Sequence, residues 1–145
     1  MSAVPILLAE DSAEDVDLIH EAFEIHDLPV ELHPVRDGVE ALRFLRREAD
    51  YADAPWPGLM LLDLNMPRKD GREVLAEVKS DAELRHLPVL ILTTSDAEAD
   101  IVESYNRRAN AYLTKPTDFD DFLDLIRYLG EFWLTAAQLP PRGRH

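Results

Sequence analysis

The sequence predicts an α/β domain in which a doubly wound, five-stranded parallel sheet carries helices on both faces. The first observation is a set of short, continuous apolar runs at residues 6–9, 59–62 and 87–92, which suit strands buried on both sides. The second is that segments with helical spacing of apolar residues separate these runs. The third is the regular alternation of the two patterns, because right-handed crossovers between parallel strands place helices over both faces.

Five strands are expected in chain order. Residues 6–9 form the first, and a weaker apolar pattern over residues 30–35 predicts the second. The runs at 59–62 and 87–92 are the third and fourth strands, and residues 111–113 are the fifth. The stretch from residue 50 to residue 58 contains two prolines and a glycine, so it is expected to be a loop before the third strand.

Apolar residues spaced three and four apart predict five helices, one after each strand. Helix start signals support four of them, at Ser12, Asp37, Ser95-Asp96 and Thr117-Asp118. The apolar positions are Val16, Ile19 and Phe23; Val39, Leu42 and Leu45; Val74, Leu75 and Val78; Ile101, Val102 and Tyr105; and Phe119, Phe122, Leu123, Ile126, Leu129 and Trp133.

Composition restricts the class of protein. The chain has 145 residues, of which 46% are hydrophobic, and this is enough for one domain with a buried core. A formal net charge of -14, from 15 Lys and Arg against 29 Asp and Glu, would repel a nucleic-acid backbone. The chain has no cysteine, no apolar run long enough to cross a bilayer and no signal-peptide pattern. We therefore expect a cytoplasmic protein that binds neither nucleic acid nor membrane.

Polar side chains follow four of the predicted strands. Glu10 and Asp11 follow the first, Asp63 the third, Thr93 the fourth and Lys115 the fifth. Because working sites of open α/β sheets lie beyond the carboxyl ends of the strands, these groups are expected to converge. Crowded carboxylates need a compensating cation, and Mg²⁺ suits an oxygen-rich site that keeps several waters. The pattern predicts an aspartyl phosphate on Asp63, with Lys115 and Thr93 binding phosphoryl oxygens.

Each residue alone also has an ordinary structural explanation. An acidic pair stabilises the start of a helix, and Asp63 beside Asn65 is a typical turn sequence. A threonine at a strand end is common, and a single lysine such as Lys115 is usually solvated. The functional interpretation is favoured because all of these explanations would have to hold at once.

Four ordered segments resemble the receiver domains of bacterial two-component response regulators. The resemblance extends from about residue 4 to residue 130, and the ordered set is much more specific than any one segment. It implies a flavodoxin-like fold with strand order 2-1-3-4-5 and a signalling protein rather than an enzyme. The segments are Ile6-Leu7-Leu8-Ala9-Glu10-Asp11, Leu61-Leu62-Asp63-Leu64-Asn65-Met66-Pro67 followed by Asp70-Gly71, Leu92-Thr93-Thr94-Ser95, and Ala111-Tyr112-Leu113-Thr114-Lys115-Pro116.

The resemblance implies a phosphoacceptor and a metal site. It makes Asp63 the residue that accepts a phosphoryl group from a sensor histidine kinase. It places Mg²⁺ on the carboxylates of Asp11 and Asp63 and on the backbone carbonyl of Asn65, with Glu10 assisting through water. Self-phosphorylation from small donors and self-dephosphorylation are then the only reactions expected of the protein itself.

The resemblance also implies a switch. Thr93 and Tyr112 match a coupled pair in which the hydroxyl moves toward the phosphoryl group while the aromatic ring turns inward. Lys115 contacts the phosphoryl group, and the Lys115–Pro116 peptide bond is expected to be cis. The altered surface is the face formed by the fourth helix, the fifth strand and the fifth helix.

Three positions depart from the commonest family pattern. Glu10 stands where Asp is frequent, which lengthens the reach of one carboxylate. Thr94 follows the switch hydroxyl where Ala is usual, which narrows access to the phosphoryl group. Arg108 stands where Gly is frequent, so the local turn is in question while the chemistry is not.

The C-terminal region carries a second resemblance, which is shorter and less specific than the first and points to a narrower group of proteins. We expect residues 4–130 to form the receiver domain and residues 131–145 to extend the last helix and end in a frayed tail from residue 139. Glu131-Phe132-Trp133-Leu134 resembles a subgroup of stand-alone regulators that partner bacterial phytochrome kinases. Phe132 and Trp133 either complete the core-facing side of the last helix or form an exposed patch that pairs with a second copy.

Other functions remain to be distinguished. The protein could act as a dimeric receiver scaffold, or as a phosphorelay intermediate or phosphate sink. An Asp-nucleophile phosphohydrolase on a similar sheet would usually have a second catalytic Asp where this chain has Asn65. A nucleotide or flavin binder would need a glycine-rich turn after the first strand, and the sequence has none there.

Overall fold

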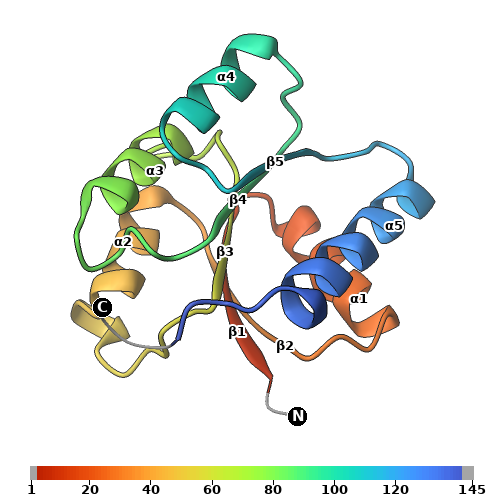
Figure 1. Ribbon diagram of the computed structural model, residues 1–145, viewed down its shortest axis with the longest axis horizontal. Helices are drawn as coiled ribbons and strands as arrows, with labels where there is room; N and C mark the ends of the chain where they lie inside the picture. Colours follow the sequence, from red (N-terminus) through yellow and green to blue (C-terminus); the bar gives the residue numbers. More distant parts are fainter. Residues whose placement is uncertain (1–2, 142–145) are drawn as a thin grey trace.

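The observed architecture is a parallel sheet between two layers of helices (Figure 1). The computed structural model describes residues 3–141. Every strand pairing is parallel and the strand order is β2-β1-β3-β4-β5, which confirms the predicted fold class. The strands are β1 (Val4–Ala9), β2 (Val30–Val35), β3 (Leu59–Leu62), β4 (Val89–Thr93) and β5 (Ala111–Thr114). The α-helices are α1 (Ala13–Ile25), α2 (Gly38–Arg46), α3 (Gly71–Ser80), α4 (Glu98–Asn106) and α5 (Phe119–Gly130).

Helices cover both faces of the sheet. In Figure 1, α2 and α3 lie on one side, α1 and α5 lie on the other, and α4 lies above α3 beside β5. Every residue of β3 and β4 is buried, as expected for central strands. This double coverage explains why their sequences are continuously apolar instead of alternating. Within residues 3–141, no helix has both the length and the apolar composition that crossing a membrane requires.

Three of the predicted helix start signals are true caps. The side chains of Ser12, Asp37 and Asp118 accept hydrogen bonds from backbone N–H groups in the first turns of α1, α2 and α5. The signal at Ser95 is different, because α4 begins further along the chain. The Ser95 hydroxyl oxygen accepts a hydrogen bond from the N–H of Ala97 at 3.3 Å, inside the loop between β4 and α4. This loop is therefore longer than the sequence indicated.

The turn before β5 forms without the glycine that is frequent there. Arg108 adopts a φ of 72°, in the left-handed region that glycine occupies most easily. The turn is held by backbone hydrogen bonds from the N–H of Arg108 to Tyr105 and from the N–H of Ala109 to Ser104. The departure at Arg108 leaves the path of the chain into β5 intact.

The last helix continues past α5. A π-helix, Glu131–Ala136, follows Gly130 directly, and Gly130 has helical φ and ψ angles of -65° and -45°. The two aromatic residues of this segment have different surroundings. Trp133 is partly buried against the core beneath α1 and α5, whereas Phe132 is 56% exposed, with its ring centroid 5.3 Å from that of Trp133. Trp133 therefore fits the first interpretation, whereas Phe132 has the exposure that the second requires and its pairing with a second copy stays a prediction.

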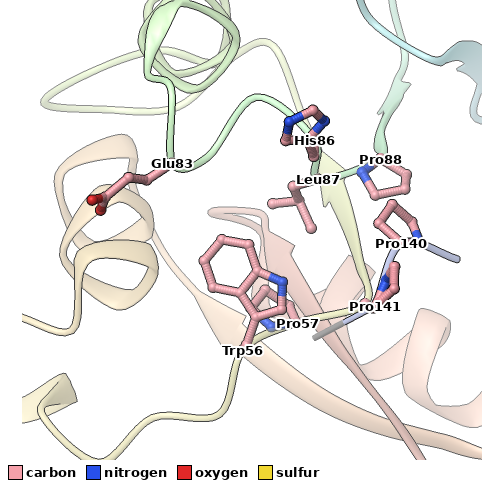
Figure 2. Close-up of a pocket in the computed structure, with 9 residues that line it drawn as sticks. Trp56, Pro57, Glu83, His86, Leu87, Pro88, Pro140 and Pro141 are labelled. Atoms are coloured by element: carbon pink, nitrogen blue, oxygen red, sulfur yellow. The ribbon is translucent and has the colours of Figure 1, made fainter. Parts of the chain in front are cut away.

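The tail is ordered further than expected. Pro140 and Pro141 line a small pocket with Trp56, Pro57 and Pro88 (Figure 2). A Cβ atom placed on Gly58 would lie 3.2 Å from Cδ1 of Leu139, so this leucine packs at the start of β3. The frayed-tail prediction is wrong for residues 139–141, because proline rings and a leucine pack there against apolar side chains. Residues 142–145 lie outside the described part of the chain.

Candidate functional site

Backbone hydrogen bonds that continue the sheet past its strand ends bring the predicted site together. The N–H of Glu10 donates to Val35 at 3.0 Å, and the N–H of Asp63 donates to Ala9 at 3.0 Å. The N–H of Lys115 donates to Thr93 at 2.7 Å. Each functional residue is thus fixed to its neighbouring strand, and the parallel register places Glu10, Asp63, Thr93 and Lys115 at one edge of the sheet.

Three carboxylates form a cluster that fits a divalent cation. One oxygen from each of Glu10, Asp11 and Asp63 lies within 4.8 Å of the others. Glu10 and Asp63 are only 2% and 8% exposed, while Asp11 is exposed to solvent. Hard cations take oxygen ligands, and Mg²⁺ keeps several waters when few carboxylates bind it. The cluster therefore has the donor set and the solvent access that such an ion needs.

Lys115 is the counter-charge of this cluster. Its Nζ donates to Asp15 at 2.8 Å and to Asp63 at 3.4 Å, and it also donates to Glu10. Its side chain is 5% exposed, so the ammonium is buried among carboxylates. Burial disfavours the ammonium, but the hydrogen bonds to Asp15 and Glu10 and the charge of Asp63 raise the pKa of Lys115. Lys115 is therefore positively charged at neutral pH.

Glu10 differs from an ordinary surface glutamate. Burial raises the pKa of its carboxyl to about 7, although the hydrogen bond from Lys115 opposes the shift. The nearby negative charge of Asp63 acts in the same direction as burial. The Glu10 carboxyl is therefore harder to ionise than that of a solvent-exposed glutamate.

The structure adds Asp15 to the residues that the sequence indicated. Its carboxylate is partly exposed, lies in the first turn of α1 and bonds to Lys115. The sequence pattern indicated Ser12 as the start of this helix and did not single out Asp15. A signal was available, because Asp15 lies four residues after Asp11, in the first turn of the helix that follows β1.

Thr93 and Tyr112, the predicted switch pair, lie on the same face of the sheet as each other. The hydroxyl oxygen of Thr93 is buried and, within residues 3–141, has no hydrogen-bond partner. The Tyr112 hydroxyl donates to the backbone oxygen of Ser95 at 2.8 Å, and partial burial raises the pKa of this tyrosine. Asn65 donates its backbone N–H to Oδ1 of Asp63 at 3.3 Å. An unpaired buried hydroxyl beside Asp63's strand is what a site for an incoming acceptor requires.

One geometric expectation is wrong. The Lys115–Pro116 peptide bond is trans, as are the other peptide bonds between described residues. Lys115 reaches the carboxylates without the tight turn, because the hydrogen bond from its N–H to Thr93 already fixes its backbone next to β4.

Gly71 is required by the backbone that carries Asp63. A Cβ atom on Gly71 would lie 2.1 Å from the carbonyl oxygen of Asp63 and 2.8 Å from Cα of Leu64. Gly71→Ala is therefore expected to lower the free energy of unfolding by about 2 kcal/mol, because backbone must move. Urea denaturation measures this loss. The control is Gly58→Ala, whose Cβ would meet the side chains of Val4 and Leu139; equal stability of the two variants would contradict the packing argument.

Fold and site together define a response regulator receiver domain. Residues 6–127 match the family described as the response regulator receiver domain, and the chain belongs to this family. Response regulator Rcp1 of Synechocystis sp. is 44% identical over 135 residues, which are 93% of this chain and 92% of that relative.

Two solved structures extend the comparison. The phosphorylated cyanobacterial phytochrome response regulator RcpA matches with a TM-score of 0.92 and 46% identity, covering 97% of this chain and 100% of that one. The Mn²⁺-bound form of Rcp1 matches with a TM-score of 0.90 and 43% identity, covering 95% and 99% of the two chains. This protein is therefore a receiver-type response regulator similar to regulators of phytochrome signalling.

Proposed function

We propose that the protein is a stand-alone response regulator that accepts a phosphoryl group on Asp63 from a sensor histidine kinase. The observation that carries this proposal is the position of Lys115, whose ammonium contacts both Asp63 and Glu10 in a buried acidic cluster. An isolated structural ion pair would need one carboxylate, whereas this lysine faces several. Such an excess of negative charge around one nucleophilic carboxylate suits a site that receives a cation and an anion together.

The reaction is an in-line displacement. One carboxylate oxygen of Asp63 supplies an electron pair to the phosphorus of the kinase phosphohistidine. The P–N bond breaks, and its electron pair stays on the imidazole nitrogen, which takes up a proton. Lys115 and Thr93 then bind two oxygens of the transferred group, which satisfies the Thr93 hydroxyl. The product is an aspartyl phosphate and a free histidine.

Mg²⁺ is the proposed cofactor. Glu10, Asp11, Asp63 and the backbone carbonyl of Asn65 would hold it, and the cluster geometry and the Mn²⁺-bound form of the relative Rcp1 support this assignment. When bound, the ion supplies positive charge that neutralises the phosphoryl oxygens. The residues of this chain provide the nucleophile, the orientation and the second positive charge.

Mg²⁺ affinity is expected to depend on pH through Glu10. The Glu10 pKa is raised to about 7, so below this pH a proton competes with the ion. The dissociation constant should therefore fall by up to about tenfold per pH unit as pH rises toward 7, and level off above it. Calorimetric titration in buffers of different ionisation enthalpy measures both affinity and proton release. In Glu10→Gln the proton release should vanish; an unchanged release would assign it to another group.

The same pKa predicts how folding stability depends on pH without metal. Because the folded-state pKa of Glu10 lies above its ordinary value of 4.5, the folded protein binds more protons than the unfolded chain between pH 4.5 and about 7. The contribution of Glu10 to stability is therefore fully present below this window. It is lost as pH rises through the folded-state pKa.

The output is proposed to leave through the face made by α4, β5 and α5. Movement of Thr93 toward the phosphoryl group would change the contacts of Tyr112, whose hydroxyl bonds to the loop before α4. Val102 and Tyr105 of α4 and Phe119 of α5 are about half exposed on these elements. A partner that buries these side chains would distinguish the two states of the face.

A bacterial phytochrome kinase is the proposed phosphoryl donor, and the cytoplasm, where ATP is available to such a kinase, is the proposed location. The similarity to RcpA and Rcp1 supports the partnership. A purified bacteriophytochrome kinase labelled with radioactive ATP is expected to transfer its label to this protein within minutes, and an unrelated histidine kinase only slowly. Equal transfer from both kinases would remove the phytochrome assignment while leaving the receiver function.

Phe132 is proposed to contribute to a homodimer, with Trp133 supporting it from the partly buried side. The 56% exposure of Phe132 supports a contact with a second copy. Sedimentation velocity of wild type and of Phe132→Ala tests this, and equal monomer content in both would contradict it.

Dimeric scaffolding and service as a phosphorelay intermediate or sink remain alternatives, which the lifetime of the phosphorylated state separates. A phosphohydrolase is disfavoured because Asn65 follows Asp63 where a second carboxylate would act.

A further inference from the structure

Helix α4 is attached to the domain with little apolar burial. Its only buried residue is Ser104, while Val102 is 51% and Tyr105 is 49% exposed. By contrast, α3 buries Val74, Leu75 and Val78 against the core. A helix without a buried apolar stripe depends on polar contacts for its position. The contacts that α4 makes with its neighbours therefore decide where it lies.

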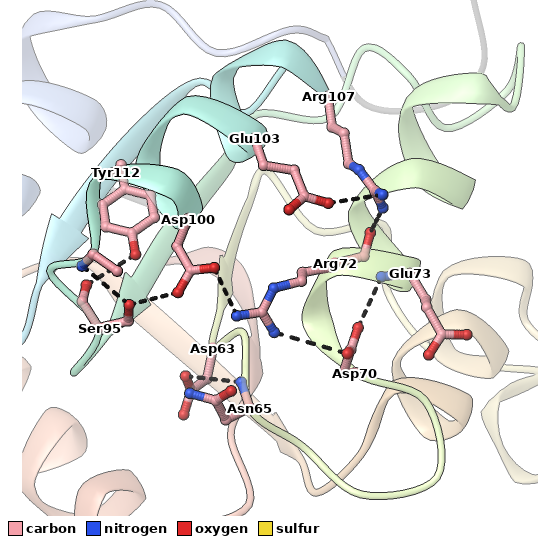
Figure 3. A network of polar contacts seen from close by, with 11 residues as sticks. Asp63, Asn65, Asp70, Arg72, Glu73, Ser95, Asp100, Glu103, Arg107 and Tyr112 are labelled. Carbon is pink, nitrogen blue, oxygen red and sulfur yellow. Dashed lines mark hydrogen bonds and ion pairs between the residues drawn. The ribbon is translucent and has the colours of Figure 1, made fainter.

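Arg72 of α3 makes two of these contacts, one toward each end of α4 (Figure 3). Its guanidinium Nη2 donates to Oδ1 of Asp100 at 2.9 Å, in the N-terminal half of α4. Its carbonyl oxygen accepts a hydrogen bond from Nη1 of Arg107 at 3.0 Å, at the C-terminal end of α4. The Arg72 and Asp100 side chains are 27% and 22% exposed, so the ion pair is better shielded from water than most surface pairs.

The same ion pair is connected to the loop that follows Thr93. The second carboxylate oxygen of Asp100 accepts a hydrogen bond from the Ser95 hydroxyl at 2.6 Å. The backbone oxygen of Ser95 in turn accepts the hydrogen bond from the Tyr112 hydroxyl. Side chains from α3, α4, the loop and β5 thus form one continuous chain of polar contacts, as Figure 3 shows.

At its other end the chain of contacts reaches the loop that carries Asp63. Arg72 directly follows Gly71, whose N–H donates to the carbonyl of Leu64 at 2.9 Å. Arg72 also lies 3.8 Å from the carboxylate of Asp70, the residue that caps α3. The Arg72 end of this chain of contacts is therefore fixed to the segment immediately after Asp63.

We propose that Arg72 is a positioning residue that clamps α4 and the Ser95 loop to α3 and so sets how readily phosphorylation moves them. This inference rests on the proposed function of Asp63. Arg72 takes no part in the chemistry, since its guanidinium is bound by Asp100. Loss of the Arg72–Asp100 ion pair loosens α4 and the Ser95 loop, whose backbone oxygen accepts the hydrogen bond from Tyr112. The acidic cluster stays in place.

Hydrogen exchange measured by mass spectrometry on the full chain tests the clamp. In Arg72→Gln and in Asp100→Asn, amides of α4 and of residues 94–97 are expected to exchange about fivefold faster than in wild type, while α1 and α5 stay unchanged. The double variant should exchange no faster than the faster single variant, because each single variant already removes the same Arg72–Asp100 ion pair. Arg72→Lys, which keeps the charge, should restore part of the protection.

Arg46→Gln is the matched control, because Arg46 pairs with Glu77 and Asp81 at 3.6 and 3.9 Å, away from α4. Beryllofluoride with Mg²⁺, a phosphoryl mimic, should change α4 exchange less in Arg72→Gln than in wild type. Wild-type exchange at α4 in Arg72→Gln, or additive effects in the double variant, would overturn the clamp. Labelling of Asp63 in Arg72→Gln should persist, which separates failure of the clamp from failure of the phosphoacceptor.

Discussion

Replacing Asp63 by asparagine is expected to abolish phosphoryl uptake. The amide has no anionic oxygen to attack phosphorus. Incubation with radioactive acetyl phosphate and Mg²⁺ should label wild type and leave Asp63→Asn at background. Folding should survive, because the amide is nearly isosteric and one negative charge leaves a crowded acidic cluster.

The matched control is Asp53→Asn, which removes an exposed carboxylate in the segment before β3, whereas the cluster lies after the strand ends. It should label like wild type. Thermal unfolding of both variants checks that neither has lost its fold. Label that persists in a folded Asp63→Asn protein would move the acceptor to another residue and remove the basis of the proposed mechanism.

Replacing Lys115 by methionine is expected to affect both the chemistry and the fold. The labelling rate should fall about 10²-fold, the usual effect of removing one preorganised positive or hydrogen-bonding group. The free energy of unfolding should fall by about 3 kcal/mol at pH 8, since Glu10 and Asp63 would lose a buried partner. Acidification toward pH 6 should recover part of this loss, because protonation of Glu10 removes the unpaired charge.

Lys69→Met is the control for the loss of a lysine. Lys69 pairs with Glu77, and the two side chains are 29% and 36% exposed, so we expect a change of less than about 1 kcal/mol and no change in labelling. A Lys115→Met protein that is as stable and as rapidly labelled as Lys69→Met would show that Lys115 is not the counter-charge of the site.

The fold and the centre of the site were predictable because both depend on short-range patterns. Continuous apolar runs report burial on both sides of a parallel strand, and the residue after each run must lie at one edge of the sheet. These facts alone predict that three of the site residues lie close together, namely Asp63, Thr93 and Lys115. The family resemblance then added Asn65 and Tyr112, which strand ends do not single out.

The features that the sequence did not reveal depend on contacts between distant side chains. Asp15 looked like part of a helix start, and only the approach of β5 shows that it binds Lys115. Arg72 and Asp100 are two of many charged residues in an acidic chain, and their pairing depends on how α3 and α4 lie. Tail packing against Trp56 has no local sequence signal either.

The most direct test is intact-protein mass spectrometry after phosphorylation, followed by peptide mapping under conditions that preserve acyl phosphates. The proposed function predicts one added phosphoryl group per chain, located on the peptide that contains Asp63 and absent when Mg²⁺ is chelated. A phosphoryl group on any other residue, or full uptake without a divalent cation, would contradict it.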